Sequence, residues 1–89
     1  MIWSVEFDAG AKKDLEKLDR QVARRIVAFL ANRVAKLEDP RSIGQALRGS
    51  ELGDFWKYRV GDYRVICDIQ DRRLLVLVLR VGNRREVYR

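Results

Sequence analysis

Residues 55–69 read Phe-Trp-Lys-Tyr-Arg-Val-Gly-Asp-Tyr-Arg-Val-Ile-Cys-Asp-Ile, and this segment gives the clearest local signal of secondary structure in the chain. Apolar or aromatic residues alternate with other residues on both sides of Gly61-Asp62, which is typical of two β-strands joined by a tight turn. Glycine accepts the positive φ that a two-residue hairpin turn requires. Such a turn also sets the register. The predicted pairs are Val60 with Tyr63, Arg59 with Arg64, Tyr58 with Val65 and Lys57 with Ile66.

The same alternation divides the hairpin into two faces. One face is expected to belong to the core and carries Trp56, Tyr58, Val60, Tyr63, Val65, Cys67 and Ile69. The other face carries Phe55, Lys57, Arg59, Arg64, Ile66 and Asp68. Like charges directly opposite each other destabilise a sheet by roughly 0.2–1 kcal/mol. Arg59 opposite Arg64 is therefore a small liability that a bound phosphate would turn into charge-assisted hydrogen bonds.

The segments before the hairpin predict one strand and two helices. Residues 2–7 alternate as a strand does, and Asp8 and Asp19 are candidate N-caps of the helices that follow. The second helix is expected to continue until Pro40, which lacks the backbone donor that a helix interior needs. Its apolar positions recur at helical spacing: Val22, Ile26, Phe29, Leu30, Val34 and Leu37.

Residues 41–50 are expected to form a loop. Residues 74–79 are apolar at every position, which suits a central strand buried on both faces, and Gly82 and Asn83 are expected to end it. The prediction is one α+β domain over residues 1–89. It has an N-terminal strand, a two-helix hairpin and a three-stranded antiparallel meander, with the helices packed on one face of a mainly antiparallel sheet.

Composition limits the chemistry that the chain can perform. The 89 residues include no histidine and one cysteine. The lack of histidine removes the usual acid–base group near neutral pH. A single cysteine excludes an internal disulfide framework and cysteine-cluster zinc sites. No apolar run approaches the ~20 residues that span a bilayer. Because the first residues also lack the pattern of a signal peptide, we expect a cytoplasmic protein with no membrane association.

The charge distribution indicates a polyanionic partner. The chain carries 19 Lys and Arg against 13 Asp and Glu, and residues 57–89 hold most of the excess. A basic patch of this kind is the electrostatic footprint of nucleic-acid binding, although a basic surface that is merely solvated has the same pattern. Asp62, Asp68 and Asp71 lack a fixed ligand spacing, so neither a metal nor another cofactor is expected.

The chain resembles the RelE/ParE toxin superfamily, the toxin halves of bacterial and archaeal toxin–antitoxin pairs. The resemblance covers nearly the whole sequence and rests on the order of several phrases. They are the opening strand, the two helices, Leu47-Arg48-Gly49, Trp56-Lys57-Tyr58-Arg59, Tyr63-Arg64-Val65, Val81-Gly82-Asn83-Arg84 and Glu86-Val87-Tyr88. For the RelE branch, the resemblance implies an endoribonuclease that cleaves messenger RNA in the ribosomal A site.

The resemblance also implies site residues. Lys57 and Arg59 match the first basic pair, Arg64 the phosphate-binding arginine, Arg84 the region of the general acid, and Tyr88 the C-terminal tyrosine. Arg48 and Arg85 add to the RNA-binding set. Arg59 stands where some relatives have lysine, and arginine essentially cannot deprotonate. General-base work therefore moves toward Lys57, with Tyr88 as the alternative for the 2′-hydroxyl proton.

Two other functions fit the same sequence. One is a ParE-like toxin that poisons DNA gyrase without nuclease chemistry, and the other is a non-catalytic nucleic-acid-binding module. The joint presence of Lys57, Arg59, Arg64, Arg84 and Tyr88 favours the RelE-like reading. Both toxin readings imply an antitoxin, expected to be acidic where it binds the toxin and to fold on contact.

Overall fold

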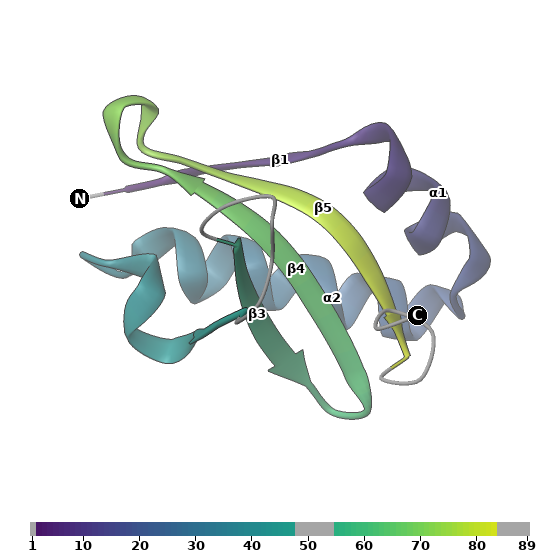
Figure 1. The fold of residues 1–89 in the computed structure, drawn as a ribbon. Helices are drawn as coiled ribbons and strands as arrows, with labels where there is room; N and C mark the ends of the chain where they lie inside the picture. Colours follow the sequence, from purple (N-terminus) through teal and green to yellow (C-terminus); the bar gives the residue numbers. More distant parts are fainter. Residues whose placement is uncertain (1, 48–54, 84–89) are drawn as a thin grey trace.

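A computed structural model describes residues 2–47 and 55–83 of the chain. Their strands form one five-stranded sheet in the order β1-β5-β4-β3-β2. The strands are β1 (Ser4–Phe7), β2 (Gln45–Ala46), β3 (Phe55–Val60), β4 (Tyr63–Gln70) and β5 (Leu75–Asn83). The helices are α1 (Ala9–Lys17) and α2 (Arg20–Asn32), with short 3₁₀ turns η1 (Val34–Lys36), η2 (Pro40–Ile43) and η3 (Asp71–Arg73). Figure 1 shows α2 crossing behind the sheet, which confirms the predicted α+β fold.

The predicted register of the β3–β4 hairpin is confirmed. Val60 pairs with Tyr63, Arg59 with Arg64, Tyr58 with Val65 and Lys57 with Ile66. Gly61 takes a φ of 59°, the conformation expected when glycine occupies the first central position of a hairpin turn.

The strand β5 holds the sheet together. It pairs antiparallel with β4 and parallel with β1, from Ser4 opposite Leu75 to Phe7 opposite Val78. A register shift between Ile66 and Cys67 marks a β-bulge in the β4–β5 pair. Of the predicted apolar run, Leu74 lies outside the strand with a φ of 47°, so the strand begins one residue later than expected.

One face of the sheet packs against the helices. Ile26 and Leu30 of α2 are fully buried against the core face of β3, β4 and β5. Phe29 contacts the ring of Tyr58 edge-on, with centroids 6.0 Å apart. Asp19 caps α2 as predicted, since its carboxylate accepts a 3.0 Å hydrogen bond from the backbone N–H of Gln21. No helix in the described ranges is long and apolar enough to cross a membrane.

The end of the second helix was predicted wrongly. The α-helix ends at Asn32, and Val34–Lys36 form a 3₁₀ turn instead of continuing toward Pro40. Val34 and Ala35 are buried, and the carbonyl of Ala35 accepts a 2.8 Å hydrogen bond from the backbone N–H of Trp3. The 3₁₀ turn is therefore hydrogen-bonded to the residue just before β1, a contact that the spacing of apolar residues does not reveal.

Two strand predictions also need correction. Residues 41–50 were expected to be a loop, but Gln45–Ala46 form β2 and pair with Lys57 and Trp56 of β3. Gly82 and Asn83 were expected to end the last strand, but they belong to it and pair with Arg64 and Tyr63. A neighbouring strand supplies the pairing in both cases, so weak β propensity does not decide the outcome.

Candidate nucleic-acid interface

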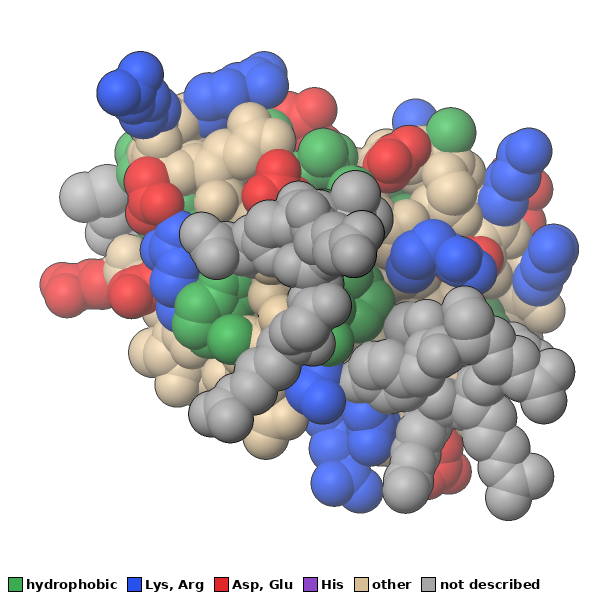
Figure 2. All heavy atoms as spheres, in the orientation of Figure 1, with side chains coloured by type: hydrophobic (Ala, Val, Ile, Leu, Met, Phe, Trp, Pro, Cys, Tyr) green, Lys and Arg blue, Asp and Glu red, His purple; other side chains and the backbone are tan. Residues whose placement is uncertain are grey.

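Three of the predicted site residues line one small hollow on the sheet face away from the helices. This cation pocket is formed by Ile43, Gln45, Lys57, Arg59 and Arg64, and its volume is about 160 Å³. Figure 2 shows Lys and Arg side chains gathered at the lower end of this face, where Figure 1 places the β3–β4 turn. Pockets for drug-sized ligands run from about 300 to 1,000 Å³. The cation pocket thus suits a single anionic group of a larger molecule.

The hairpin register is what brings the cations together. Arg59 lies directly opposite Arg64, and side chains at such positions have Cβ atoms about 4.5–5.5 Å apart. Lys57 lies two residues before Arg59 on the same strand and therefore shares its face. Arg64 pairs on its other side with Gly82 of β5, which adds no side chain there.

The two arginines of this pocket have no carboxylate partner within the described residues. Arg64 donates a 3.2 Å hydrogen bond to the carbonyl of Tyr63, which orients its guanidinium without neutralising it. Asp68 accepts a hydrogen bond from Gln70 and forms no ion pair with either arginine of the pocket. Arg59 is exposed, while Arg64 is half-buried. The pocket therefore keeps positive charge that is available to an anion.

Other arginines of the chain are used differently. Arg41 binds both Asp71 and Asp39 and lies over the ring of Trp56, 5.9 Å from its centroid. The hydrogen bond that Arg41 donates to Asp71 is the main reason why the pKa of Arg41 is raised above its ordinary value. Arg80 binds Asp14 at 2.9 Å. These ion pairs connect elements of the fold, in contrast to the arginines of the cation pocket.

A hydrogen bond on the core side of the sheet holds the segment that leads into β2, the strand that carries Gln45 of the pocket. The hydroxyl of Tyr58 is buried and donates a 2.6 Å hydrogen bond to the carbonyl of Pro40 in η2. Burial raises the pKa of Tyr58 far above its ordinary value, so the hydroxyl keeps the proton that it donates. A Cβ at Gly44 would lie 3.1 Å from the Tyr58 ring and 3.3 Å from the carbonyl oxygen of Lys57. Glycine thus lets the backbone that leads into β2 approach β3 closely.

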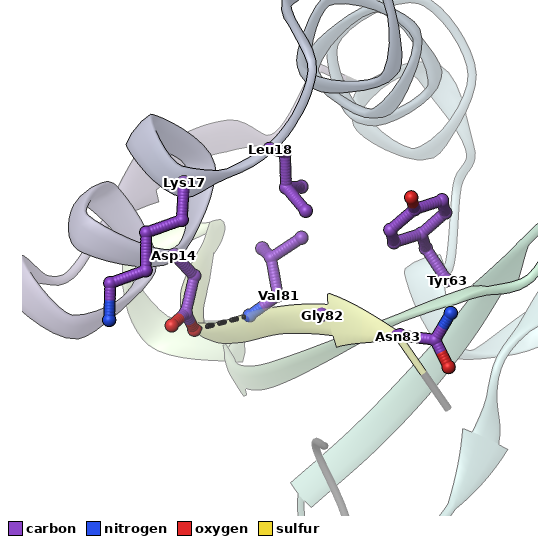
Figure 3. A pocket seen from close by; sticks show the side chains of 7 residues that line it. All are labelled: Asp14, Lys17, Leu18, Tyr63, Val81, Gly82 and Asn83. Atoms are coloured by element: carbon purple, nitrogen blue, oxygen red, sulfur yellow. Dashed lines mark hydrogen bonds between the residues drawn. The ribbon is translucent and has the colours of Figure 1, made fainter. Parts of the chain in front are cut away.

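A second, larger hollow lies between α1 and the end of β5. Its volume is about 510 Å³, and it is lined by Asp14, Lys17, Leu18, Tyr63, Val81, Gly82 and Asn83 (Figure 3). The carboxylate of Asp14 accepts a 2.9 Å hydrogen bond from the backbone N–H of Val81. The pairing of β1 with β5 ends at Val78, so Asp14 supplies the partner for the N–H of Val81 on this edge of β5. With one lysine and one aspartate in its lining, this hollow lacks the positive charge that a polyanion requires.

The remaining predicted residues are not placed. Arg48, Arg84, Arg85 and Tyr88 lie outside the described residues. The described chain approaches the pocket closely, however, because β5 ends at Asn83 opposite Tyr63, next to the Arg64–Gly82 pair. Among the described residues, no three His, Cys, Asp or Glu side chains are grouped so that they could hold a metal ion.

Sequence reasoning missed two residues of the pocket, Ile43 and Gln45. Both fell in the segment that was predicted to be a loop. Gln45 joins the cations only because β2 pairs with β3 and places it opposite Lys57. A two-residue strand carries no alternation, so the sequence held no local signal for this pairing.

Comparison with known proteins identifies the class of protein to which this fold and pocket belong. The family described as ParE toxin of type II toxin-antitoxin system, parDE, matches residues 5–88. The chain belongs to the RelE/ParE toxin superfamily and is a RelE-family toxin of a type II toxin–antitoxin system.

Named relatives lie on the RelE side of the superfamily. Toxin RelG of Mycobacterium tuberculosis is 33% identical over 89 residues, which cover 100% of this chain and 99% of RelG. The mRNA interferase toxin RelE of Escherichia coli is also 33% identical, over 99% of this chain and 92% of its own length.

Solved structures agree with this placement. The RelBE2 toxin–antitoxin complex of M. tuberculosis contains a chain that superposes with a TM-score of 0.84 at 31% identity, covering 94% of this chain and 93% of that one. The intact E. coli RelBE complex gives a TM-score of 0.72 at 28% identity, covering 91% and 95%. Both of these structures are therefore complexes of a toxin with an antitoxin.

Proposed function

We propose that this toxin is a metal-independent endoribonuclease that cleaves messenger RNA on the ribosome and so stops translation. The observation that carries the proposal is the convergence of Lys57, Arg59 and Arg64 on one small pocket in which neither arginine is paired with a described carboxylate. The E. coli relative named mRNA interferase points to the same chemistry.

RNA supplies its own nucleophile, the 2′-hydroxyl. Cleavage requires that this hydroxyl lose its proton, that the negative charge growing on the phosphorus centre be stabilised, and that the departing 5′-oxygen gain a proton. The P–O5′ bond breaks as the 2′-oxygen binds phosphorus. The products are a 2′,3′-cyclic phosphate and a 5′-hydroxyl end.

Each basic residue has a proposed role in this reaction. Arg64, oriented by the carbonyl of Tyr63, holds the scissile phosphate, and Arg59 assists it from the opposite strand. Lys57 removes the 2′-hydroxyl proton, with Tyr88 as the alternative base. Arg84, which directly follows the end of β5 in sequence, stabilises charge at the leaving oxygen. Arg48 and Arg85 contribute to RNA binding.

The ribosome contributes orientation in this proposal. The chain has no histidine, the usual acid–base group near neutral pH, so cleavage depends strongly on how the substrate is held. Holding the messenger in an attack-ready geometry is worth several kcal/mol of barrier. Slow or absent cleavage of free RNA is therefore expected, together with cleavage of ribosome-bound messenger.

The proposal includes an antitoxin partner in the cytoplasm. An acidic segment that folds on contact would neutralise the arginine pair of the cation pocket and block access to it. Relatives of this chain have been crystallised in complexes with RelB antitoxins.

Gyrase poisoning is the second candidate, because the matching family is described as ParE toxin. Mapping of cut sites and product ends on ribosome-bound messenger distinguishes the two functions when it is paired with gyrase cleavage-complex assays. Cyclic phosphate ends on cut messenger and unaffected gyrase are the expected results. Intact messenger together with trapped gyrase would overturn the proposal, and 5′-phosphate ends would point to a different nuclease chemistry.

A further inference from the structure

The neutral side of the cation pocket carries an amide that matches the edge of a nucleobase. We infer that Gln45 reads the base beside the scissile phosphate and favours adenine there, so that the toxin selects its cut sites by protein contact. This inference rests on the proposed ribonuclease function and adds a specificity determinant to it.

The sheet places Gln45 on the same face as the cations. Gln45 pairs with Lys57 across β2 and β3, and residues opposite each other on neighbouring strands project to the same side. The pocket is therefore divided by type of side chain. Lys57, Arg59 and Arg64 form its charged side, and Gln45 and Ile43 form its uncharged side.

The Gln45 amide is exposed, and no described residue forms a hydrogen bond with it. The backbone that carries it is well anchored, however. The N–H of Leu47 donates to the carbonyl of Phe55 at 2.9 Å, and Tyr58 holds η2 through Pro40. An unoccupied amide on an anchored strand is suited to recognition, because little backbone freedom is lost on binding.

The chemistry of the two sides matches that of a nucleotide. Arginine and lysine grip phosphate, whereas glutamine offers a donor and an acceptor side by side. That pair fits N6 and N7 of adenine, and the edges of single-stranded RNA bases are open to such contacts. Ile43, half-buried beside Gln45, gives an apolar surface for the face of the same base.

The test is the distribution of cut sites on ribosome-bound messenger for the wild type, Gln45→Met and Gln21→Met. Methionine keeps the length of glutamine and removes its amide. Gln21 is exposed on α2, outside the pocket, and is the matched control. A bidentate base contact discriminates by about tenfold or more. We expect a preference of that size for adenine next to the cut in the wild type and in Gln21→Met. We expect its loss in Gln45→Met, where cutting at adenine sites falls to the level of the other sites.

Each other outcome rejects the inference in a recognisable way. Cutting without an adenine preference, an adenine preference that survives Gln45→Met, or an equal loss in Gln21→Met rejects the role of Gln45 while leaving the ribonuclease proposal standing. Absence of cutting by the wild type on ribosomes rejects the ribonuclease proposal and this inference with it.

Discussion

Arg59 of β3 and Arg64 of β4 lie directly opposite each other on the sheet face away from the helices, and neither has a carboxylate partner among the described residues. Elsewhere in the described chain, Arg41 and Arg80 are held by aspartates. Repulsion between the two arginines is expected to weaken the sheet slightly, and a bound anion is expected to offset it.

Replacing Arg59 with Gln removes the repulsion across the hairpin. The free energy of unfolding is expected to rise by about 0.2–1 kcal/mol at low ionic strength and to approach the wild-type value in high salt, which screens exposed charges. Urea titrations at two salt concentrations measure this change. Arg72→Gln is the control, since Arg72 is exposed in η3, at the far end of β4 from the pocket. A lower stability of Arg59→Gln at low salt would show that the pair is not a liability.

Replacing Tyr58 with Phe removes the buried hydrogen bond to Pro40 and leaves that carbonyl without its partner. A loss of about 1–3 kcal/mol in the free energy of unfolding is expected. Tyr63→Phe is the matched control, because the Tyr63 hydroxyl forms no hydrogen bond with a described residue. Equal effects of the two substitutions in urea unfolding would contradict the anchoring role of Tyr58.

Cys67 is fully buried, and burial raises the pKa of its thiol well above the ordinary value. The native state keeps this proton at pH values where the unfolded chain has released it. The stabilising contribution is therefore complete below about pH 8.5 and declines as the pH rises above that value. Between about pH 8 and 9.5, Cys67→Ala should flatten the fall of stability with pH. A thiol reagent should label the wild type only as fast as it unfolds, and rapid labelling of the native protein would refute this burial.

Local patterns predicted the parts of the fold that local chemistry determines. The hairpin register followed from Gly61-Asp62, and the first turn of α2 from the Asp19 cap. The parallel pairing of β1 with β5 joins residues about seventy positions apart, and nothing within either strand specifies it. The same holds for the 3₁₀ turn after Asn32, in which the carbonyl of Ala35 accepts a hydrogen bond from the distant Trp3.

The residues of the cation pocket also differ in how far the sequence predicts them. Lys57, Arg59 and Arg64 could be grouped from the sequence because one hairpin carries all three. Gln45 could not be added, since its place depends on the pairing of a two-residue strand with β3, where Gly44 lies close to Tyr58. The charged side of the pocket was therefore predictable, and the uncharged side was not.

The most direct test of the central claim compares Arg64→Ala with Arg72→Ala in single-turnover cleavage of ribosome-bound messenger. Both variants lose one positive charge, but only Arg64 lines the cation pocket. Removing one group that stabilises the charged transition state costs about 10²–10³ in rate. We predict a loss of that size for Arg64→Ala, with folding unchanged and Arg72→Ala close to wild type. Full activity of a folded Arg64→Ala variant would contradict the role of the cation pocket in cleavage.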